Sequence, residues 1–111
     1  MSDHIVLIAS LFIHPGREAE FHQFETAAAR IMKKYGGRVE RVIRPTMSSA
    51  SDALPYEVHV VTFPNREQFE AYRADSELTS FAELRQTAIA RTDVLIGEDG
   101  EPYLGGMSVR S

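Results

Sequence analysis

Residues 56–72, YEVHVVTFPNREQFEAY, constrain the fold more than any other stretch of the chain. The first eight residues are mostly β-branched or aromatic, which predicts a strand from Tyr56 to Phe63. Pro64 and Asn65 interrupt this pattern, and Asn65 is a suitable N-terminal cap for the helix that the following residues predict. A strand that passes into a helix through two residues is half of an α/β unit.

The first half of the chain shows the same order. Ile5–Ile13 predicts a strand that is apolar at every odd position and mixed at even positions. A helix follows from about residue 17 to 35, and Gly36-Gly37 ends it because glycine adopts the left-handed conformation at little cost. The charged segment Arg38–Arg44 predicts a strand at a sheet edge, and a polar, mobile loop is expected from Thr46 to Leu54. The apolar stripe of the helix consists of Phe21, Phe24, Ala28, Ile31 and Tyr35.

The second half ends in a helix and a strand. The helical pattern after Asn65 is interrupted or capped again at Asp75-Ser76 and continues to about Arg91. Thr92–Ile96 predicts the last strand. We therefore expect a single domain over residues 1–97 and a C-terminal arm or disordered tail over residues 98–111.

Composition limits the classes of function. The chain has 111 residues, enough for one hydrophobic core, and a formal net charge of −4, which argues against nucleic acid and anionic membrane surfaces as partners. It has no cysteine, so thiolate chemistry is excluded and a reducing, cytoplasmic location is expected. The apolar run Ile5–Ile13 is too short to span a membrane and lacks the flanking features of a signal peptide.

The order strand–helix–strand–strand–helix–strand predicts an α+β, ferredoxin-like fold, with both helices on one face of a four-stranded antiparallel sheet. The other face would stay uncovered, and we expect Glu57 and His59 to lie on it among apolar side chains. Such a patch predicts a partner, and a second copy packed sheet to sheet would make a homodimeric barrel. The apolar residues that we assign to this face are Val6, Ile8, Phe12, Val61 and Phe63.

Several short motifs occur in order between about residues 4 and 97. They are Lys34–Arg38 (KYGGR), Phe63-Pro64, Ala71-Tyr72, Ser76-Glu77, Leu84-Arg85 and Thr92–Val94. In this arrangement the chain resembles the dimeric α+β barrel superfamily, and within it the uncharacterised family called domain of unknown function thirteen-thirty. The resemblance implies the fold and a homodimer. Sister families include cofactor-independent monooxygenases of aromatic compounds, haem-degrading enzymes, isomerases and ligand binders.

Two features depart from the family pattern. Thr62 stands where the family often has an acid before the Phe-Pro pair, so a role for that acid is not carried over to this chain. The second strand and the loop that leads to Leu54 also differ from the usual pattern.

Glu57 and His59 form the most suggestive polar pair, because residues two apart on a strand point to the same side. A carboxylate beside an imidazole favours its charged form, fixes its tautomer and allows it to act as a general base. The alternative is that Glu57 lies at the barrel rim while His59 makes an interface hydrogen bond. No histidine has the spacing of a metal motif, so we expect neither a metal nor an organic cofactor.

Two functions follow from these observations. In the first, the protein is a monooxygenase- or isomerase-like enzyme for a small, partly apolar acidic molecule, with His59 as base and Glu57 as its orienting group. The pocket would lie between helices and sheet or inside the barrel. An arginine of the second strand, Arg41, would bind the anion, and Ser10 and Phe12 would line the pocket. In the second, the protein is a non-catalytic homodimer that binds a small ligand or has a structural role, and the arginines form a solvated edge strand.

Overall fold

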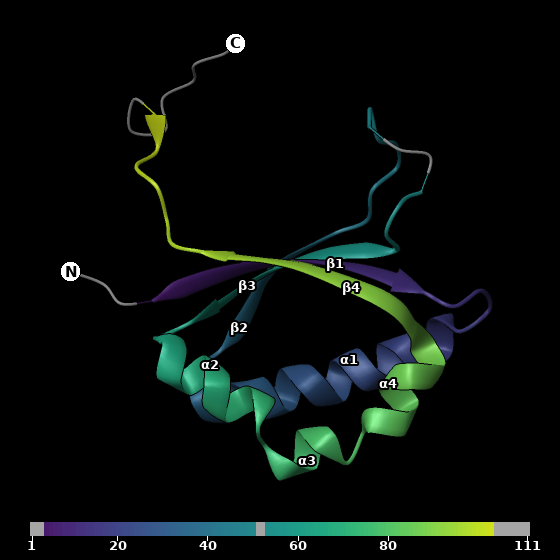
Figure 1. Ribbon diagram of the computed structural model, residues 1–111, viewed down its shortest axis with the longest axis horizontal. Coiled ribbons are helices and arrows are strands. Elements are labelled where there is room, and N and C mark those ends of the chain that lie inside the picture. The colour runs from purple at the N-terminus through teal and green to yellow at the C-terminus, as the bar shows by residue number, and fades with distance from the viewer. Residues whose placement is uncertain (1–3, 51–52, 104–111) are drawn as a thin grey trace.

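One layer of helices covers one face of a four-stranded antiparallel sheet in the computed structural model, which describes residues 4–50 and 53–103 (Figure 1). The sheet order is β2-β3-β1-β4, so the charged strand β2 lies at an edge, as predicted. This arrangement confirms the ferredoxin-like fold. The strands are β1 (Ile5–Ile13), β2 (Arg38–Ile43), β3 (Glu57–Phe63) and β4 (Ile89–Gly97).

The second predicted helix consists of three short helices. The side chain of Asn65 caps α2 by accepting a hydrogen bond from the Gln68 backbone, and Asp75 caps α3 in the same way. The predicted helix end near Arg91 is wrong, because the chain enters β4 at Ile89, which pairs with Ile13 of β1. The helices are α1 (Glu18–Met32), the 3-10 turn η1 (Lys33–Tyr35), α2 (Arg66–Arg73), α3 (Ser76–Thr79) and α4 (Ala82–Ala88).

The turn between η1 and β2 requires both glycines, for different reasons. Gly36 has a φ of +74°, which confirms the left-handed end of the helix. A Cβ atom on Gly37 would lie 2.5 Å from side-chain atoms of Met32 and Phe63. The absence of a side chain at Gly37 therefore lets the start of β2 pack directly against the core.

The strand register corrects one prediction. In the β1–β3 pairing, Ala9 lies opposite His59 and Leu11 lies opposite Glu57, so Glu57 and His59 share a face with the buried odd residues of β1. That face is the one under the helices, and it also carries Val61 and Phe63. The prediction that these four residues lie on the uncovered face is wrong. The alternation within each strand was correct, but only the pairing between strands decides which set is covered.

The uncovered face carries the even residues of β1, including Val6, Ile8 and Phe12 as predicted. A register irregularity between Val39 and Arg41 marks a β-bulge in β2, and after it Arg41 lies opposite Val60 on this face. Residues 44–50 and 53–56, between β2 and β3, and residues 98–103, after β4, project on this side, away from the helices (Figure 1). Residues 51–52 of the predicted loop and 104–111 of the predicted tail lie outside the described residues.

The core consists of two hydrophobic clusters between the sheet and the helices. One is centred on Phe21 of α1, the other on Phe63 of β3, and both of these side chains are fully buried. None of the helices in the described part of the chain has the length and apolar character needed to cross a membrane.

Candidate functional site

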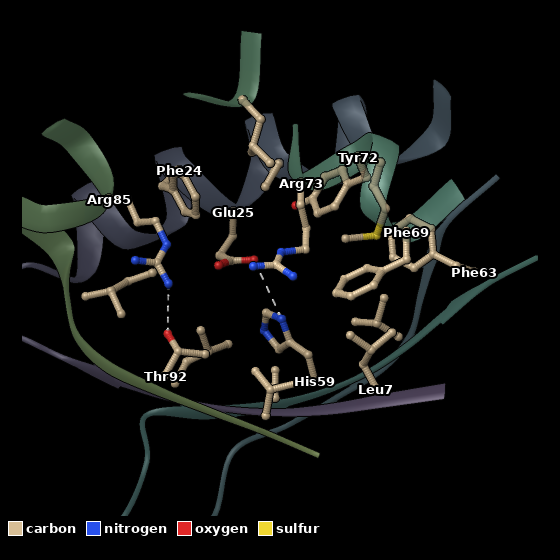
Figure 2. Close-up of a pocket in the computed structure, with 18 of the residues that line it drawn as sticks. Leu7, Phe24, Glu25, His59, Phe63, Phe69, Tyr72, Arg73, Arg85 and Thr92 are labelled. Atoms are coloured by element: carbon tan, nitrogen blue, oxygen red, sulfur yellow. Dashed lines mark hydrogen bonds and ion pairs between the residues drawn. The ribbon is translucent and has the colours of Figure 1, made fainter. Parts of the chain in front are cut away.

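A cavity of about 420 Å³ lies between the helices and the covered face of the sheet, adjoining both core clusters (Figure 2). Its volume falls within the range of small-molecule pockets. Most of its wall is apolar, with a few polar groups, which is the usual composition of a ligand site. The polar residues that line it are Glu25, His59, Tyr72, Arg73, Thr79, Arg85 and Thr92.

The side chains of Glu57 and His59 on β3 form a hydrogen bond. The Nε2 atom of His59 lies 2.8 Å from Oε1 of Glu57, and both side chains are buried. The other carboxylate oxygen of Glu57 accepts a hydrogen bond of 2.9 Å from Nε of Arg44, the first residue after β2. Burial alone would raise the pKa of Glu57, but the hydrogen bonds from His59 and Arg44 outweigh it, so its pKa lies below the usual value. Glu57 is therefore a carboxylate at neutral pH.

This pairing decides which nitrogen of His59 is free to react. An ionised carboxylate can only accept, so Nε2 carries the hydrogen that Glu57 binds. In the neutral ring, Nδ1 then holds the lone pair, and it lies 3.6 Å from Oε1 of Glu25. Glu25 extends from the helical layer toward His59 on the sheet (Figure 2). The free nitrogen of the imidazole thus adjoins the Glu25 carboxyl beside the cavity.

Glu25 is a largely buried carboxyl group on α1. Within residues 4–50 and 53–103 it makes no hydrogen bond, and its nearest charged partner is His59. Burial is the main cause that raises the pKa of Glu25, and the nearby negative charge of Glu57 adds to the increase. The positive charges of His59 and Arg85 only partly oppose this rise in pKa. Glu25 therefore holds a proton more readily than an exposed glutamate.

Two guanidinium groups lie at the exposed side of the cavity. Arg85 of α4 donates a hydrogen bond of 3.3 Å to the hydroxyl of Thr92, and no carboxylate in the described part of the chain forms an ion pair with it. Arg73 of α2 makes a long contact of 3.4 Å with Glu70. Burial, followed by the charge of Glu25, raises the pKa of Tyr72 to about 12, so its phenol remains a neutral donor.

The structure brings together only part of the site that the sequence predicts. Glu57 and His59 are adjacent, and His59 lines the cavity. Ser10, Phe12 and Arg41 lie on the opposite face of the sheet, so they do not converge with His59. Phe12 instead packs under Arg91, whose guanidinium carbon is 4.0 Å from the ring centroid.

Sequence reasoning missed the carboxyl, phenol and guanidinium groups of the cavity, and only the carboxyl has a visible signal in the sequence. Glu25 lies four residues after Phe21 and three before Ala28, so it is a charged residue within the buried stripe of α1. A carboxylate at such a position indicates a function or a buried partner. Tyr72, Arg73 and Arg85 carry no comparable signal, since they occur on short helices with ordinary surface composition.

Groups of three or more His, Asp or Glu side chains arranged to hold a metal ion are absent from the two described ranges, 4–50 and 53–103. The polar groups around His59 are instead suited to the transfer of protons and to the binding of an anion.

Comparison with known proteins agrees with the fold. A family model described as a domain of unknown function (DUF1330) matches residues 7–98. No curated protein sequence matches the chain.

Among solved structures, a protein of unknown function from Rhodopseudomonas palustris has a TM-score of 0.81 at 12% identity, over 92% of this chain and 86% of that one. A cofactor-independent oxygenase from Streptomyces nogalater has a TM-score of 0.68 at 14% identity, over 93% and 99%. A dimeric α+β barrel family protein with a ferredoxin-like fold from Mesorhizobium loti has a TM-score of 0.63 at 14% identity, over 88% and 98%. At these identities the likeness shows a shared fold alone.

Proposed function

This chain belongs to the family described as a domain of unknown function (DUF1330), and we propose that it is a small enzyme that removes a proton from a compact, partly apolar acid. One observation carries the proposal: the buried Glu57–His59 pair lies at the wall of an apolar cavity, with Nδ1 of His59 on the side of Glu25. A general base must reach its substrate and must hold a fixed tautomer. Both conditions agree with the contacts around His59.

The proton transfer follows from these contacts. Nδ1 of His59 accepts a proton from an activated C–H or O–H group of the substrate, and the ring becomes an imidazolium. Glu57 stabilises this cation through the hydrogen bond from Nε2, while Arg44 holds Glu57 in place from the other side. The mostly apolar walls lower the local dielectric constant around the reacting group, which strengthens each of these electrostatic contacts.

We assign anion binding to Arg85. It takes the role that we assigned to Arg41 from the sequence, because Arg85 lines the cavity and has no carboxylate partner in the described part of the chain. A guanidinium group binds a carboxylate or an enolate in two-point fashion. The substrate class is therefore a small carboxylic acid with an apolar body that fits a cavity of about 420 Å³.

The reaction class that we propose is monooxygenase- or isomerase-like chemistry without an organic cofactor. The similar fold of the Streptomyces nogalater oxygenase, which is described as cofactor-independent, supports this class. A cytoplasmic location stays our expectation for a chain without cysteine.

We also propose a homodimer formed through the uncovered face of the sheet. Leu95, at 72% exposure, and Ile43, at 39%, add apolar surface there to the even residues of β1. The similar protein from Mesorhizobium loti belongs to a family named for dimeric barrels, which supports the same arrangement here. The catalytic pair lies on the other face, so the dimer would support the sheet and would leave the cavity open.

Replacement of His59 by Gln tests the catalytic role. Exchange of the C3 protons of phenylpyruvate into D2O is measured by NMR, together with the melting temperature. We expect the exchange catalysed by the wild type to fall about 10²- to 10⁴-fold in His59→Gln, the usual contribution of a general base. His22→Gln, an exposed change on α1, is the matched control and should retain the wild-type rate.

The alternative function, a non-catalytic binder, predicts a different result. Phenylpyruvate would then shift the resonances of cavity residues in the wild type, but the protein would not accelerate exchange. An equal rate of exchange in wild type and His59→Gln would also contradict the catalytic proposal.

A further inference from the structure

Glu25 needs an explanation that the proposed base does not supply. It is a largely buried carboxyl at the cavity wall that makes no hydrogen bond within residues 4–50 and 53–103. Its nearest charged partner, Nδ1 of His59, is 3.6 Å away, which is beyond hydrogen-bond distance. Because buried polar groups in folded proteins nearly always make a hydrogen bond, a bound ligand is a candidate partner for this carboxyl.

The surroundings of Glu25 suit the donation of a proton rather than the binding of a cation. The charged and titratable groups near it are His59 and Glu57 from β3, Arg85 from α4, and Tyr72 from α2. Burial, with the charge of Glu57, raises the pKa of Glu25, so the carboxyl can carry a proton near the base. His59 and Glu25 are thus two acid–base groups with different tasks in one cavity.

The distance between the two groups limits the kind of transfer. Nδ1 of His59 and Oε1 of Glu25 are 3.6 Å apart, so both meet the same side of a bound molecule. Two groups this close can reach carbons that are separated by one other carbon, so one group can remove a proton while the other adds one. The gap is also short enough for a small side-chain rotation to bring the two groups into hydrogen-bond contact.

We infer that Glu25 is a second catalytic residue and that the enzyme is an isomerase, which shifts a double bond in a β,γ-unsaturated 2-oxo acid. This inference rests on the proposed function of His59 as base. Arg85 would hold the carboxylate of the substrate, and the short carbon chain would occupy the apolar part of the cavity.

The step is balanced without any other reactant. Nδ1 of His59 takes a proton from C3, the C3–H electrons form a double bond between C3 and C4, and the C4=C5 electrons take the proton of the Glu25 carboxyl at C5. The product is the conjugated 2-oxo acid, with His59 as imidazolium and Glu25 as carboxylate. The proton on Nδ1 then passes to Oε1 of Glu25, which restores the starting state.

The experiment uses 2-oxopent-4-enoate as the probe with the full chain. Ultraviolet absorbance follows formation of the conjugated product, and NMR in D2O follows exchange of the C3 protons. The variants are Glu25→Gln, His59→Gln and Glu18→Gln, the last being an exposed change on the same helix that serves as the control. Urea unfolding shows that each variant is folded.

We expect Glu25→Gln to lower isomerisation about 10²- to 10⁴-fold while it keeps C3 exchange within about tenfold, because His59 still removes the proton. His59→Gln should lose both signals, and Glu18→Gln should lose neither. Wild-type isomerisation by Glu25→Gln would overturn the role of Glu25 and leave the proposed base intact. Unchanged exchange in His59→Gln would overturn the proposed base itself. A wild type that accelerates neither process would overturn both for this class of acid.

A titration without substrate gives a second, independent test. The carboxyl carbon of Glu25, followed by NMR in labelled protein, should titrate above an ordinary glutamate. In His59→Gln the midpoint should rise further, because the positive charge of His59 lowers the pKa of Glu25. An ordinary midpoint in both proteins would show that Glu25 does not share a site with His59, and would overturn the inference.

Discussion

The two faces of the sheet are made of the same strands but have opposite characters. On the covered face, the side chains of Glu57 and His59 are buried beside an apolar cavity. On the uncovered face, half-buried aliphatic residues mix with exposed ion pairs such as Arg91–Asp93. Neighbouring residues of one strand therefore lie in different environments, because their side chains point to opposite faces of the sheet.

This difference predicts which property of the protein a substitution on each face should affect. A side chain on the covered face contacts the helices, the cavity or both, so its replacement affects folding and the site together. A side chain on the uncovered face contacts neither the helices nor the cavity, so its replacement should affect association. A substitution on one face that produces the effect expected for the other face would contradict this distinction.

The largest effect is expected from the core of the covered face. Phe21 is fully buried and its ring contacts that of Tyr56, with centroids 5.4 Å apart. Phe21→Ala should lower the free energy of unfolding by about 3–5 kcal/mol, because it leaves a cavity under α1. Phe12→Ala, the same change on the uncovered face, should cost about 1 kcal/mol. Urea unfolding at low protein concentration measures both, and equal losses would refute the distinction between the faces.

An intermediate effect is expected at Glu57. Glu57→Gln should lower stability at neutral pH by about 1.5–3 kcal/mol, since it removes a buried charge-assisted pair with His59 and Arg44. The folded pKa of Glu57 lies below its usual 4.5, so this contribution is complete above pH 4.5. It is lost as the pH falls through the lowered folded pKa.

The dependence of the unfolding free energy on pH tests the role of the Glu57 charge more directly than the loss at one pH. Unfolding curves of wild type and Glu57→Gln should therefore converge in acid. Glu83→Gln, at an exposed position on α4, should show no such convergence. A difference that stays constant from neutral pH into acid would mean that the charge of Glu57 does not stabilise the fold.

The smallest effect on stability is expected at Leu95, which is 72% exposed on the uncovered face. Leu95→Lys should change the unfolding free energy of the separated chain by less than about 0.5 kcal/mol. It should nevertheless convert the proposed dimer to a monomer, because a charge would be buried at the contact. Sedimentation at several concentrations measures the mass, and a wild-type dimer that survives this change would move the interface elsewhere.

The sequence predicted the elements of the fold well, because each was marked by local chemistry. The strand at Ile5–Ile13 has the predicted bounds, and the caps at Asn65 and Asp75 are present. The faces of β3 were assigned wrongly for a physical reason. Alternation is a property of one strand, whereas the covered set depends on the pairing with β1, which the intervening segments do not fix.

The site was predictable only where its members are close in the chain. Glu57 and His59 are two residues apart, so their pairing could be read from the strand pattern. Arg85 and Glu25 come to the same cavity from different helices, and their convergence depends on packing between elements. Arg41 lies on the other face of the sheet from His59, because the bulge breaks the alternation of β2.

That bulge has a consequence for how such a site can change over generations. The extra residue between Val39 and Arg41 sends Arg41 to one side and brings Arg44 to Glu57 on the other. Deletion of Glu40, or insertion of one residue beside it, would move the side chains of residues 41–44 to the opposite face of the sheet without any other change in the sequence. We therefore expect relatives of this chain that have an acid at position 57 also to have the same number of residues between the start of β2 and Arg44.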